Sequence, residues 1–255
     1  MSLVNTFFGP ERISEMLRDC KNIFFIGIGG IHMSSLAHIA HLAGYNVSGS
    51  DKVCSSVTKK LEKEGIKIIY KHKYESPANC DIVVYTVAIA PDNPEYVYAR
   101  EHNIPCVSRA DFLGWIMSPY KNRIGISGAH GKSTCTSMLA RAFIAANADP
   151  TVVSGAETEE LGGAYRIGGR ESIIFEACEY MDNFLCFVPS ASVILNVEYD
   201  HSDYFKDIAQ TRSLTRAAAH CGISQSAASQ RLREAEARLA TRLVDRSTRP
   251  LSLTP

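Results

Sequence analysis

The sequence has no long apolar run, no secretory signal and no paired-cysteine motif. No apolar stretch reaches the roughly 20 residues that a membrane-spanning helix needs, and the N-terminus lacks a basic start followed by an apolar core. The eight cysteines form no CxxC pair and have no histidine at metal-ligand spacing, which argues against a disulfide framework or a zinc site. We therefore expect a cytoplasmic protein that makes no contact with a membrane.

Lysine, asparagine and the aromatic residues disappear from the chain at one point. The last 47 residues, from Ala209 onward, contain eight Arg, no Lys and three acids, a net charge of +5, whereas the first 208 residues carry 19 basic and 24 acidic groups, a net charge of −5. So abrupt a change favours two genes of different base composition over two domains of one gene. We place the join near Ile208, and a chimeric artefact of two reading frames is one hypothesis for the chain.

Short apolar strands alternate with helical patterns in the first part of the chain. This βαβ rhythm predicts an α/β fold with a Rossmann-like parallel sheet in residues 1–118, followed by an incomplete P-loop α/β domain in residues 119–208. Asn93-Pro94-Glu95 is typical of a helix start, with Pro at the first helical position. The predicted strands cover residues 22–28, 47–51, 66–70, 82–85, 173–175 and 193–195, and the predicted helices include residues 33–42 and 133–145.

The turn after the first strand carries Gly27, Gly29 and Gly30. Glycines at this place let the backbone approach a pyrophosphate, which the N–H groups of the following helix then face. Asp51 stands where an acid can accept a ribose hydroxyl. His32 occupies the third glycine position of the strict GxGxxG pattern. A close strand–helix turn without a ligand is the alternative interpretation.

A second glycine-containing turn precedes the helix expected at residues 133–145. Its glycines free the loop to wrap phosphate oxygens, a lysine supplies a point charge, and a hydroxyl can coordinate Mg²⁺. The strict Walker A pattern is not met, because Ile126 occupies the place of its first glycine. The predicted nucleotide-binding residues are Gly128, Ala129, His130, Gly131, Lys132, Ser133 and Thr134.

These motifs together resemble the UDP-N-acetylmuramate–L-alanine ligases of the Mur ligase family. Gly27-Ile-Gly-Gly-Ile-His-Met-Ser34 with Val47-Ser-Gly-Ser-Asp51 is similar to the opening of that family, and Gly128-Ala-His-Gly-Lys-Ser-Thr134 to its nucleotide loop. Thr86-Val-Ala-Ile89 with Asn93-Pro-Glu95, and Glu176-Ala-Cys-Glu179 with Asp200-His201, follow in the family's order and spacing. The departures from the family pattern are His32, Ala129 and Ser133.

The resemblance implies a function in peptidoglycan synthesis: an ATP-dependent ligase that joins L-alanine to UDP-N-acetylmuramate through an acyl phosphate. Such phosphoryl transfer depends on positioning and charge neutralisation. By resemblance, Lys132 binds the β- and γ-phosphates, Thr134 or Ser133 binds a first Mg²⁺, and Glu176 and His201 hold a second. Catalytic roles are thus implied for Lys132, Glu176 and His201. The implied UDP-sugar-binding residues are Gly27, Gly29, Gly30, His32, Met33, Ser34, Asp51 and Arg166.

For three of these residues, the sequence alone also allows an ordinary surface role. Glu176 is also compatible with a solvated loop acid, and His201 with a surface imidazole. Arg166 has the position of a residue that meets a substrate anion, and an ordinary surface arginine is the alternative.

The tail resembles the helix-turn-helix of LysR-type regulators. Ala217 and Ala218 supply the small side chains of a close helix contact, Gly222 makes the turn, and Ser224 caps a second helix. DNA is then a possible partner of residues 213–255, although a helix pair without a nucleic-acid function is the alternative. The predicted DNA-binding residues are Ser226, Ser229, Gln230 and Arg233.

Both resemblances are partial. The ligase resemblance stops just past His201, about halfway along the family's length and before its amino-acid-binding domain. We therefore expect this chain by itself to lack ligase activity, and the central sheet to keep an unpaired, apolar edge. A ligase fragment, a DNA-binding regulator and a chimeric artefact remain the three hypotheses.

Overall fold

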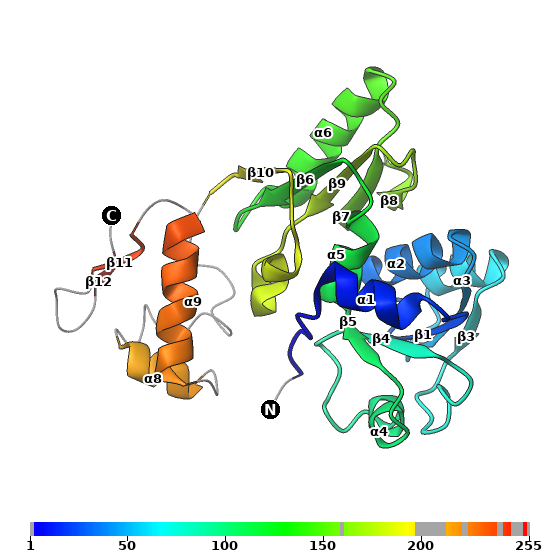
Figure 1. Ribbon diagram of the computed structural model, residues 1–255. Helices are drawn as coiled ribbons and strands as arrows, with labels where there is room; N and C mark the ends of the chain where they lie inside the picture. Colours follow the sequence, from blue (N-terminus) through cyan, green and yellow to red (C-terminus); the bar gives the residue numbers. More distant parts are fainter. Residues whose placement is uncertain are drawn as a thin grey trace. The chain divides into compact units, whose positions relative to one another are not determined.

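The chain divides into two compact units, Met1–Val197 and Glu198–Pro255. The computed structural model describes residues 3–158, 161–196, 213–220, 224–238, 242–245 and 252–253. The first unit contains two five-stranded sheets (Figure 1). No helix in these described ranges is long and apolar enough to cross a membrane.

The first sheet is the doubly wound parallel sheet that the sequence predicts. Its strand order is β3-β2-β1-β4-β5, and every neighbouring pair is parallel. Helices cover both faces of such a sheet, and the central strand is therefore apolar from Ile23 to Ile26. The strands are β1 (Asn22–Ile26), β2 (Asn46–Ser50), β3 (Lys67–Ile69), β4 (Ile82–Tyr85) and β5 (Cys106–Ser108).

Five helices accompany this sheet. The predicted helix start at Asn93 is confirmed, because its side-chain oxygen accepts hydrogen bonds from the backbone amides of Glu95 and Tyr96 at 3.0 and 3.2 Å. Ile23 and Phe25 of β1 pack into the core that includes α1, α2, α3 and α5, while Phe24 and Ile26 face the side of α4. The helices are α1 (Gly9–Leu17), α2 (Ile31–Leu42), α3 (Ser56–Lys63), α4 (Pro94–Glu101) and α5 (Arg109–Met117).

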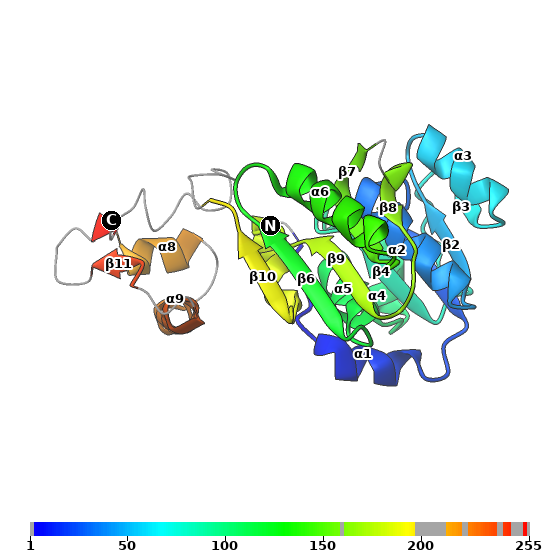
Figure 2. The same cartoon turned by 90° about the horizontal axis from the view of Figure 1, so that it is seen from above.

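The second sheet has the order β10-β6-β9-β7-β8, with β8 antiparallel to β7 and the other pairs parallel. Helix α6 (Lys132–Ala145) lies across β6, β9 and β7 (Figure 2). A short 3-10 segment, η2 (Tyr180–Cys186), follows β9. The strands are β6 (Asn122–Ser127), β7 (Thr151–Thr158), β8 (Gly163–Arg166), β9 (Ser172–Glu176) and β10 (Ala191–Ile194).

Strand β10 forms the outer edge of the second sheet. It pairs with β6 on one side, and no other strand of the described residues lies on its far side. Val193 and Ile194 are 38% and 52% exposed. An apolar strand with a free edge is what the sequence predicted for this part of the sheet.

One hydrophobic core connects the two sheets. Phe25 and Phe112 of the first sheet's side and Val153 and Phe175 of the second all belong to it. Helix α2 packs against both its own sheet and strands β7 and β8 (Figure 1). The side-chain amide of Asn5 also donates a 2.7 Å hydrogen bond to the carbonyl of Met181. The two sheets therefore meet in a packed junction.

The second unit contains a helix pair and a two-stranded sheet. The helices are α8 (Leu214–His220) and α9 (Gln225–Arg238), and β11 (Val244–Asp245) pairs with β12 (Ser252–Leu253) in antiparallel fashion. Ala218 and Leu232 are buried, and the hydroxyl of Ser224 accepts a 3.2 Å hydrogen bond from the amide of Ala227. The predicted helix pair and its cap are thus confirmed, while Gly222 lies outside the described residues.

Candidate functional site

The first glycine loop lies between β1 and α2. Gly27 has a φ of +80°, which side chains other than glycine rarely adopt. A Cβ on Gly29 would come within 2.8 Å of the Asp51 carboxylate. Gly30 is the N-cap of α2 and provides no side-chain cap. The first amides of α2 are therefore available to an anion, because the N-terminal turn of a helix leaves such groups without an intrahelical partner.

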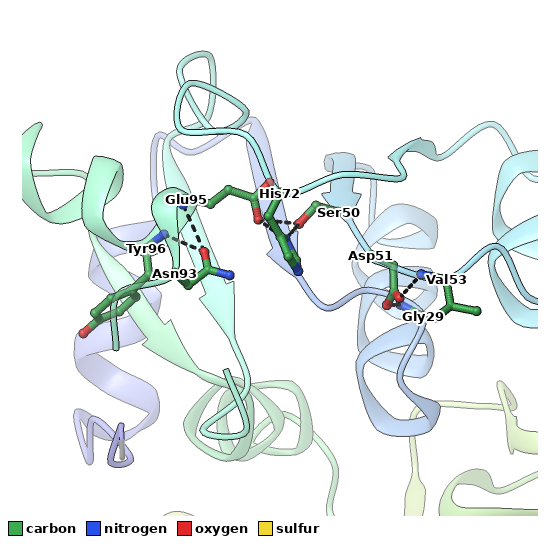
Figure 3. A network of polar contacts seen from close by, with 8 residues as sticks. All are labelled: Gly29, Ser50, Asp51, Val53, His72, Asn93, Glu95 and Tyr96. Carbon is green, nitrogen blue, oxygen red and sulfur yellow. Dashed lines mark hydrogen bonds and ion pairs between the residues drawn. The ribbon is translucent and has the colours of Figure 1, made fainter. Parts of the chain in front are cut away.

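Asp51 directly follows β2 and stabilises this loop through a hydrogen bond. Its Oδ2 accepts a 2.8 Å hydrogen bond from the amide of Gly29, and its Oδ1 accepts one of 3.0 Å from the amide of Val53 (Figure 3). The predicted acid and the predicted glycine turn are therefore in direct contact. A carboxylate has further lone pairs, so this bracing leaves room for a ligand hydroxyl.

Two predicted UDP-sugar residues have buried side chains. Met33 and Ser34 are each 2% exposed, and the hydroxyl of Ser34 donates a 2.8 Å hydrogen bond to the carbonyl of Ile31. The amide of Ser34 donates a 2.8 Å hydrogen bond to the carbonyl of Gly30. Of these two residues, the backbone amide of Met33 in the first turn of α2 is therefore the group that can meet a phosphate.

A polar cluster that the sequence did not reveal stands beside this loop. The Ser50 hydroxyl donates a 2.5 Å hydrogen bond to the carboxylate of Glu95, and Nδ1 of His72 lies 2.6 Å from the same oxygen and 3.0 Å from the hydroxyl (Figure 3). Ser50 and Glu95 are wholly buried. These residues come from the end of β2, the segment after β3 and the first turn of α4. The sequence signals were that Ser50 lies at the end of a predicted strand and that Glu95 belongs to the Asn93-Pro94-Glu95 helix start.

The second glycine loop connects β6 to α6. Gly128 and Gly131 have φ values of +145° and +83°, so both positions require glycine. The ammonium of Lys132 donates hydrogen bonds to the carbonyls of Gly128 and Ala129 at 2.5 and 3.1 Å. It also lies 3.6 Å from the carboxylate of Glu179. The lysine thus follows the inside of the loop, as a phosphate-binding lysine does.

Asn196 holds this loop from the end of β10. Its side-chain oxygen accepts a 3.1 Å hydrogen bond from the amide of His130, and its side-chain amide donates a 3.0 Å bond to the carbonyl of the same residue. Sequence reasoning missed this residue. Ser133 is half-buried and Thr134 is exposed at the start of α6.

Glu176 ends β9, the strand next to β6. Its Oε1 accepts hydrogen bonds from the hydroxyl of Ser154 at 2.8 Å and from the amide of Gly155 at 2.6 Å. Its Oε2 has no hydrogen-bond partner in the described part of the chain. A positioned carboxylate with one such oxygen fits Mg²⁺, which prefers oxygen ligands. The described residues hold no cluster of three His, Cys, Asp or Glu side chains suited to a metal, and His201 lies outside them.

Arg166 lies away from these loops. Its guanidinium donates hydrogen bonds to the carboxylate of Asp149 at 2.5 Å and to the carbonyl of Pro150 at 2.6 Å. Asp149 and Pro150 precede β7, so Arg166 lies at the amino end of that strand, whereas Glu176 and the nucleotide loop stand at carboxyl ends of parallel strands. The structure does not bring Arg166 together with the other site residues, and its role in UDP-sugar binding stays a prediction.

His32 links the two halves of the site. Its Cε1 lies 3.4 Å from the position that a Cβ on Gly155 would take, and Oε2 of Glu176 lies 2.8 Å from the same position. Burial and the nearby guanidinium of Arg109 lower the pKa of His32 to about 4, so the imidazole is neutral at pH 7. The first glycine loop therefore reaches the corner occupied by Glu176.

The predicted DNA-binding residues all lie on α9. Ser226, Ser229, Gln230 and Arg233 recur at helical spacing and thus share one face. Ser226, Gln230 and Arg233 are exposed and Ser229 is half-buried. The side-chain amide of Gln230 donates a 3.0 Å hydrogen bond to Glu234.

Comparison with known families gives one match in each of the two units of the chain. Residues 22–121 match the Mur ligase family, catalytic domain, and residues 199–255 match the bacterial regulatory helix-turn-helix proteins of the lysR family. The second match begins before the predicted join near Ile208, so the position of the join stays a prediction.

Curated UDP-N-acetylmuramate–L-alanine ligases resemble the first part of the chain. Those of Clostridium botulinum strain Eklund 17B and of Clostridium beijerinckii are each 50% identical over 188 residues, which is 74% of this chain and 41% of the relative. The chain therefore spans about two fifths of the length of the curated relatives that it matches.

Solved ligases share the fold. The UDP-N-acetylmuramate–alanine ligase of Thermotoga maritima is 32% identical with a TM-score of 0.68, and the match covers 78% of this chain and 45% of that one. A UDP-N-acetylmuramate:L-alanyl-gamma-D-glutamyl-meso-diaminopimelate ligase from Neisseria meningitides is 27% identical with a TM-score of 0.66, over 74% of this chain and 64% of that one. The N-terminal part of this chain therefore matches the Mur ligase family and is homologous to UDP-N-acetylmuramate–L-alanine ligases, and its C-terminal part matches the lysR-type helix-turn-helix proteins.

Proposed function

We propose that the first unit binds UDP-N-acetylmuramate and ATP as the substrate-binding part of an ATP-dependent ligase that acts on L-alanine. The observation that carries the proposal is the position of the two glycine loops. Each stands at the carboxyl end of a parallel strand and leads into a helix, which is where open α/β sheets bind phosphate-bearing ligands. The contact between Asp51 and Gly29 supports the sugar-nucleotide assignment of the first loop.

The second loop is the proposed ATP site. Lys132 supplies positive charge to the β- and γ-phosphates, and Ser133 or Thr134 offers a hydroxyl to Mg²⁺. Glu176 and His201 are the proposed residues for a second Mg²⁺, which would polarise the phosphate oxygens. The assignment of His201 rests on the family resemblance. Ligase turnover by these 255 residues alone is not part of the proposal, because the homologous ligases are more than twice as long as the matched segment.

Isothermal titration of the full chain with UDP-N-acetylmuramate tests this proposal. We expect saturable binding that weakens strongly in Gly29→Val, because a side chain at this position would collide with Asp51 and Thr58. Gly169→Ala is the matched control, since a Cβ there meets only ordinary contacts of 3.5 Å. No heat of binding at millimolar ligand would contradict the sugar-nucleotide assignment.

DNA binding by the second unit is the second candidate function. The match of residues 199–255 to the lysR family supports it, and so does the shared face of Ser226, Ser229, Gln230 and Arg233 on α9. In helix-turn-helix proteins the second helix enters the major groove and its side chains contact base edges. A sensor role for the first unit would belong to this candidate.

A gel shift with a duplex of random sequence tests this second candidate. We expect a complex that weakens as salt rises, because phosphate contacts release counterions. Arg233→Ala should weaken it further, whereas Arg100→Ala, an exposed arginine of the first unit, serves as the control. An affinity that neither salt nor Arg233→Ala changes would rule out this use of α9.

A further inference from the structure

Asn5 connects the N-terminal segment to η2, the segment that follows strand β9. Its side-chain amide donates hydrogen bonds to the backbone carbonyl of Met181 at 2.7 Å and to the side-chain oxygen of Asn183 at 3.1 Å. All three residues are buried, with exposed fractions of 5%, 8% and 3%. The two acceptors flank Asp182, so one amide group holds this turn of η2 on both sides.

The turn that Asn5 holds has an unfavourable backbone conformation. Met181 and Asp182 have φ values of +55° and +58°, in the left-handed region where residues other than glycine are disfavoured because Cβ approaches the following carbonyl oxygen. Such conformations persist only where the surrounding structure holds them, and they cluster at binding and catalytic sites. The two hydrogen bonds from Asn5 supply support of this kind.

The residues on both sides of Asn5 are anchored to the first sheet and its helices. The hydroxyl of Tyr85, at the end of β4, donates a 2.8 Å hydrogen bond to the carbonyl of Val4. The hydroxyl of Thr6 donates a 2.8 Å hydrogen bond to the carboxylate of Asp111 on α5. Asn5 therefore stands on a fixed segment of the first sheet's side and contacts a turn that belongs to the second sheet's side.

The turn at Asp182 is connected to the second glycine loop. The amide of Asp182 donates a 3.1 Å hydrogen bond to the carbonyl of Glu179, and the carboxylate of Glu179 lies 3.6 Å from the ammonium of Lys132. The same ammonium donates hydrogen bonds to two carbonyls of the loop. A continuous series of contacts therefore joins Asn5 to Lys132.

We propose that Asn5 is a positioning residue for the ATP site. It holds the turn at Asp182, and through that turn it keeps Glu179 next to the ammonium of Lys132. This inference rests on the proposed function, in which the second glycine loop binds ATP with Mg²⁺. A lysine that is already oriented loses less side-chain freedom when phosphates bind, and the affinity is higher for that reason.

Isothermal titration of the full chain with ATP and Mg²⁺ tests this proposal. Asn5→Ala removes both hydrogen bonds, and we expect the dissociation constant to rise roughly three- to tenfold because Lys132 loses its fixed orientation. Binding of UDP-N-acetylmuramate should stay the same within experimental error. Tyr120→Phe loses a buried 3.2 Å hydrogen bond to Thr151 at the amino end of β7. It is the control for a general loss of stability and should leave the ATP affinity unchanged.

Asp182→Gly distinguishes a positioning role from a role in stability alone. Glycine adopts positive φ values without a Cβ penalty, so the turn then depends less on Asn5. The double variant Asn5→Ala with Asp182→Gly should bring the dissociation constant for ATP back toward that of the unsubstituted chain, although both hydrogen bonds stay absent. Asn183→Ala removes one of the two bonds. It should raise the dissociation constant less than Asn5→Ala does, and it serves if Asn5→Ala folds poorly.

The outcomes separate this inference from the proposed function. Unchanged ATP affinity in Asn5→Ala and Asn183→Ala, or a loss that Asp182→Gly does not recover, would overturn the positioning role while leaving the ATP site in place. An equal loss of affinity for ATP and for UDP-N-acetylmuramate would also overturn it, because such a loss reports on folding in general. An unsubstituted chain that binds no ATP would overturn the proposed ATP site and this inference together.

Discussion

The backbone amide of Gly155 donates a 2.6 Å hydrogen bond to Oε1 of Glu176. This bond joins two neighbouring parallel strands at their carboxyl ends, and the hydroxyl of Ser154 adds a second donor to the same oxygen. The carboxylate is therefore fixed in orientation, with Oε2 turned toward the side of His32. A carboxylate held in this way is preorganised for a cation, because little side-chain freedom remains to be lost on binding.

Gly155→Ala should disturb this arrangement. The added Cβ would lie 2.8 Å from Oε2 of Glu176, so the carboxylate has to move, and the overpacking should lower the free energy of unfolding by about 1–3 kcal/mol. Urea unfolding measures the change. Gly169→Ala has ordinary contacts and should leave the midpoint nearly unchanged. Equal midpoints for the two variants would show that the corner beside Glu176 is not tightly packed.

Lys132→Met should weaken ATP binding. The side chain is 14% exposed and follows the inside of the nucleotide loop, so its loss removes a positive charge that phosphates would meet. We expect the dissociation constant for ATP with Mg²⁺ to rise roughly ten- to a hundredfold. Lys121→Met, whose side chain is 81% exposed, is the control. Unchanged ATP affinity in Lys132→Met would place the nucleotide elsewhere.

The free energy of unfolding should decrease as the pH is lowered, because of His32. Its pKa is about 4 in the folded chain and about 6.5 in an unfolded one. Between these values the unfolded chain binds a proton that the folded chain does not, so the free energy of unfolding decreases as pH falls through this window. At pH 5 the loss relative to pH 7 should reach about 2 kcal/mol.

Urea unfolding at pH 7 and pH 5 measures this effect in the unsubstituted chain and in His32→Gln. The variant should lose less stability on acidification than the unsubstituted chain. His41→Gln, at the other end of α2, is the matched control. The same pH dependence in all three proteins would exclude His32 as its source.

Asp111 anchors the N-terminal segment and should contribute to stability. It is 1% exposed, and its carboxylate accepts hydrogen bonds from the hydroxyl of Thr6 at 2.8 Å and from the amides of Phe8 and Gly9 at 2.5 and 3.2 Å. Asp111→Ala leaves these donors without their acceptor, and we expect a loss of about 2–4 kcal/mol in the free energy of unfolding. Asp92→Ala, at an exposed position, should have little effect. A midpoint for Asp111→Ala equal to that of Asp92→Ala would contradict this anchoring role.

The sequence predicted the parts of the structure that local patterns determine. A central parallel strand is apolar throughout because both faces are covered, so β1 was visible in the sequence. Gly27, Gly128 and Gly131 were visible because their positive φ values disfavour other residues. By contrast, Ser50, His72 and Glu95 come together only through the strand order, and no local pattern indicates it.

The position of Arg166 is likewise determined by strand order and not by a local sequence pattern. The sequence assigned it to a substrate anion, with an ordinary surface arginine as the alternative, whereas β8 runs antiparallel to β7 and places the arginine at the amino end of that strand. Asn196 was missed for a related reason. It contacts a loop that is far away in sequence, and that contact depends on the pairing of β10 with β6.

The most direct test of the central claim is a sequential titration of one sample of the full chain. UDP-N-acetylmuramate is added to saturation first, and ATP with Mg²⁺ is added second. If the two glycine loops are separate phosphate-binding sites, each ligand should bind once per chain, and the first should not compete with the second. Binding of neither ligand, or competition of both for a single site, would contradict the account.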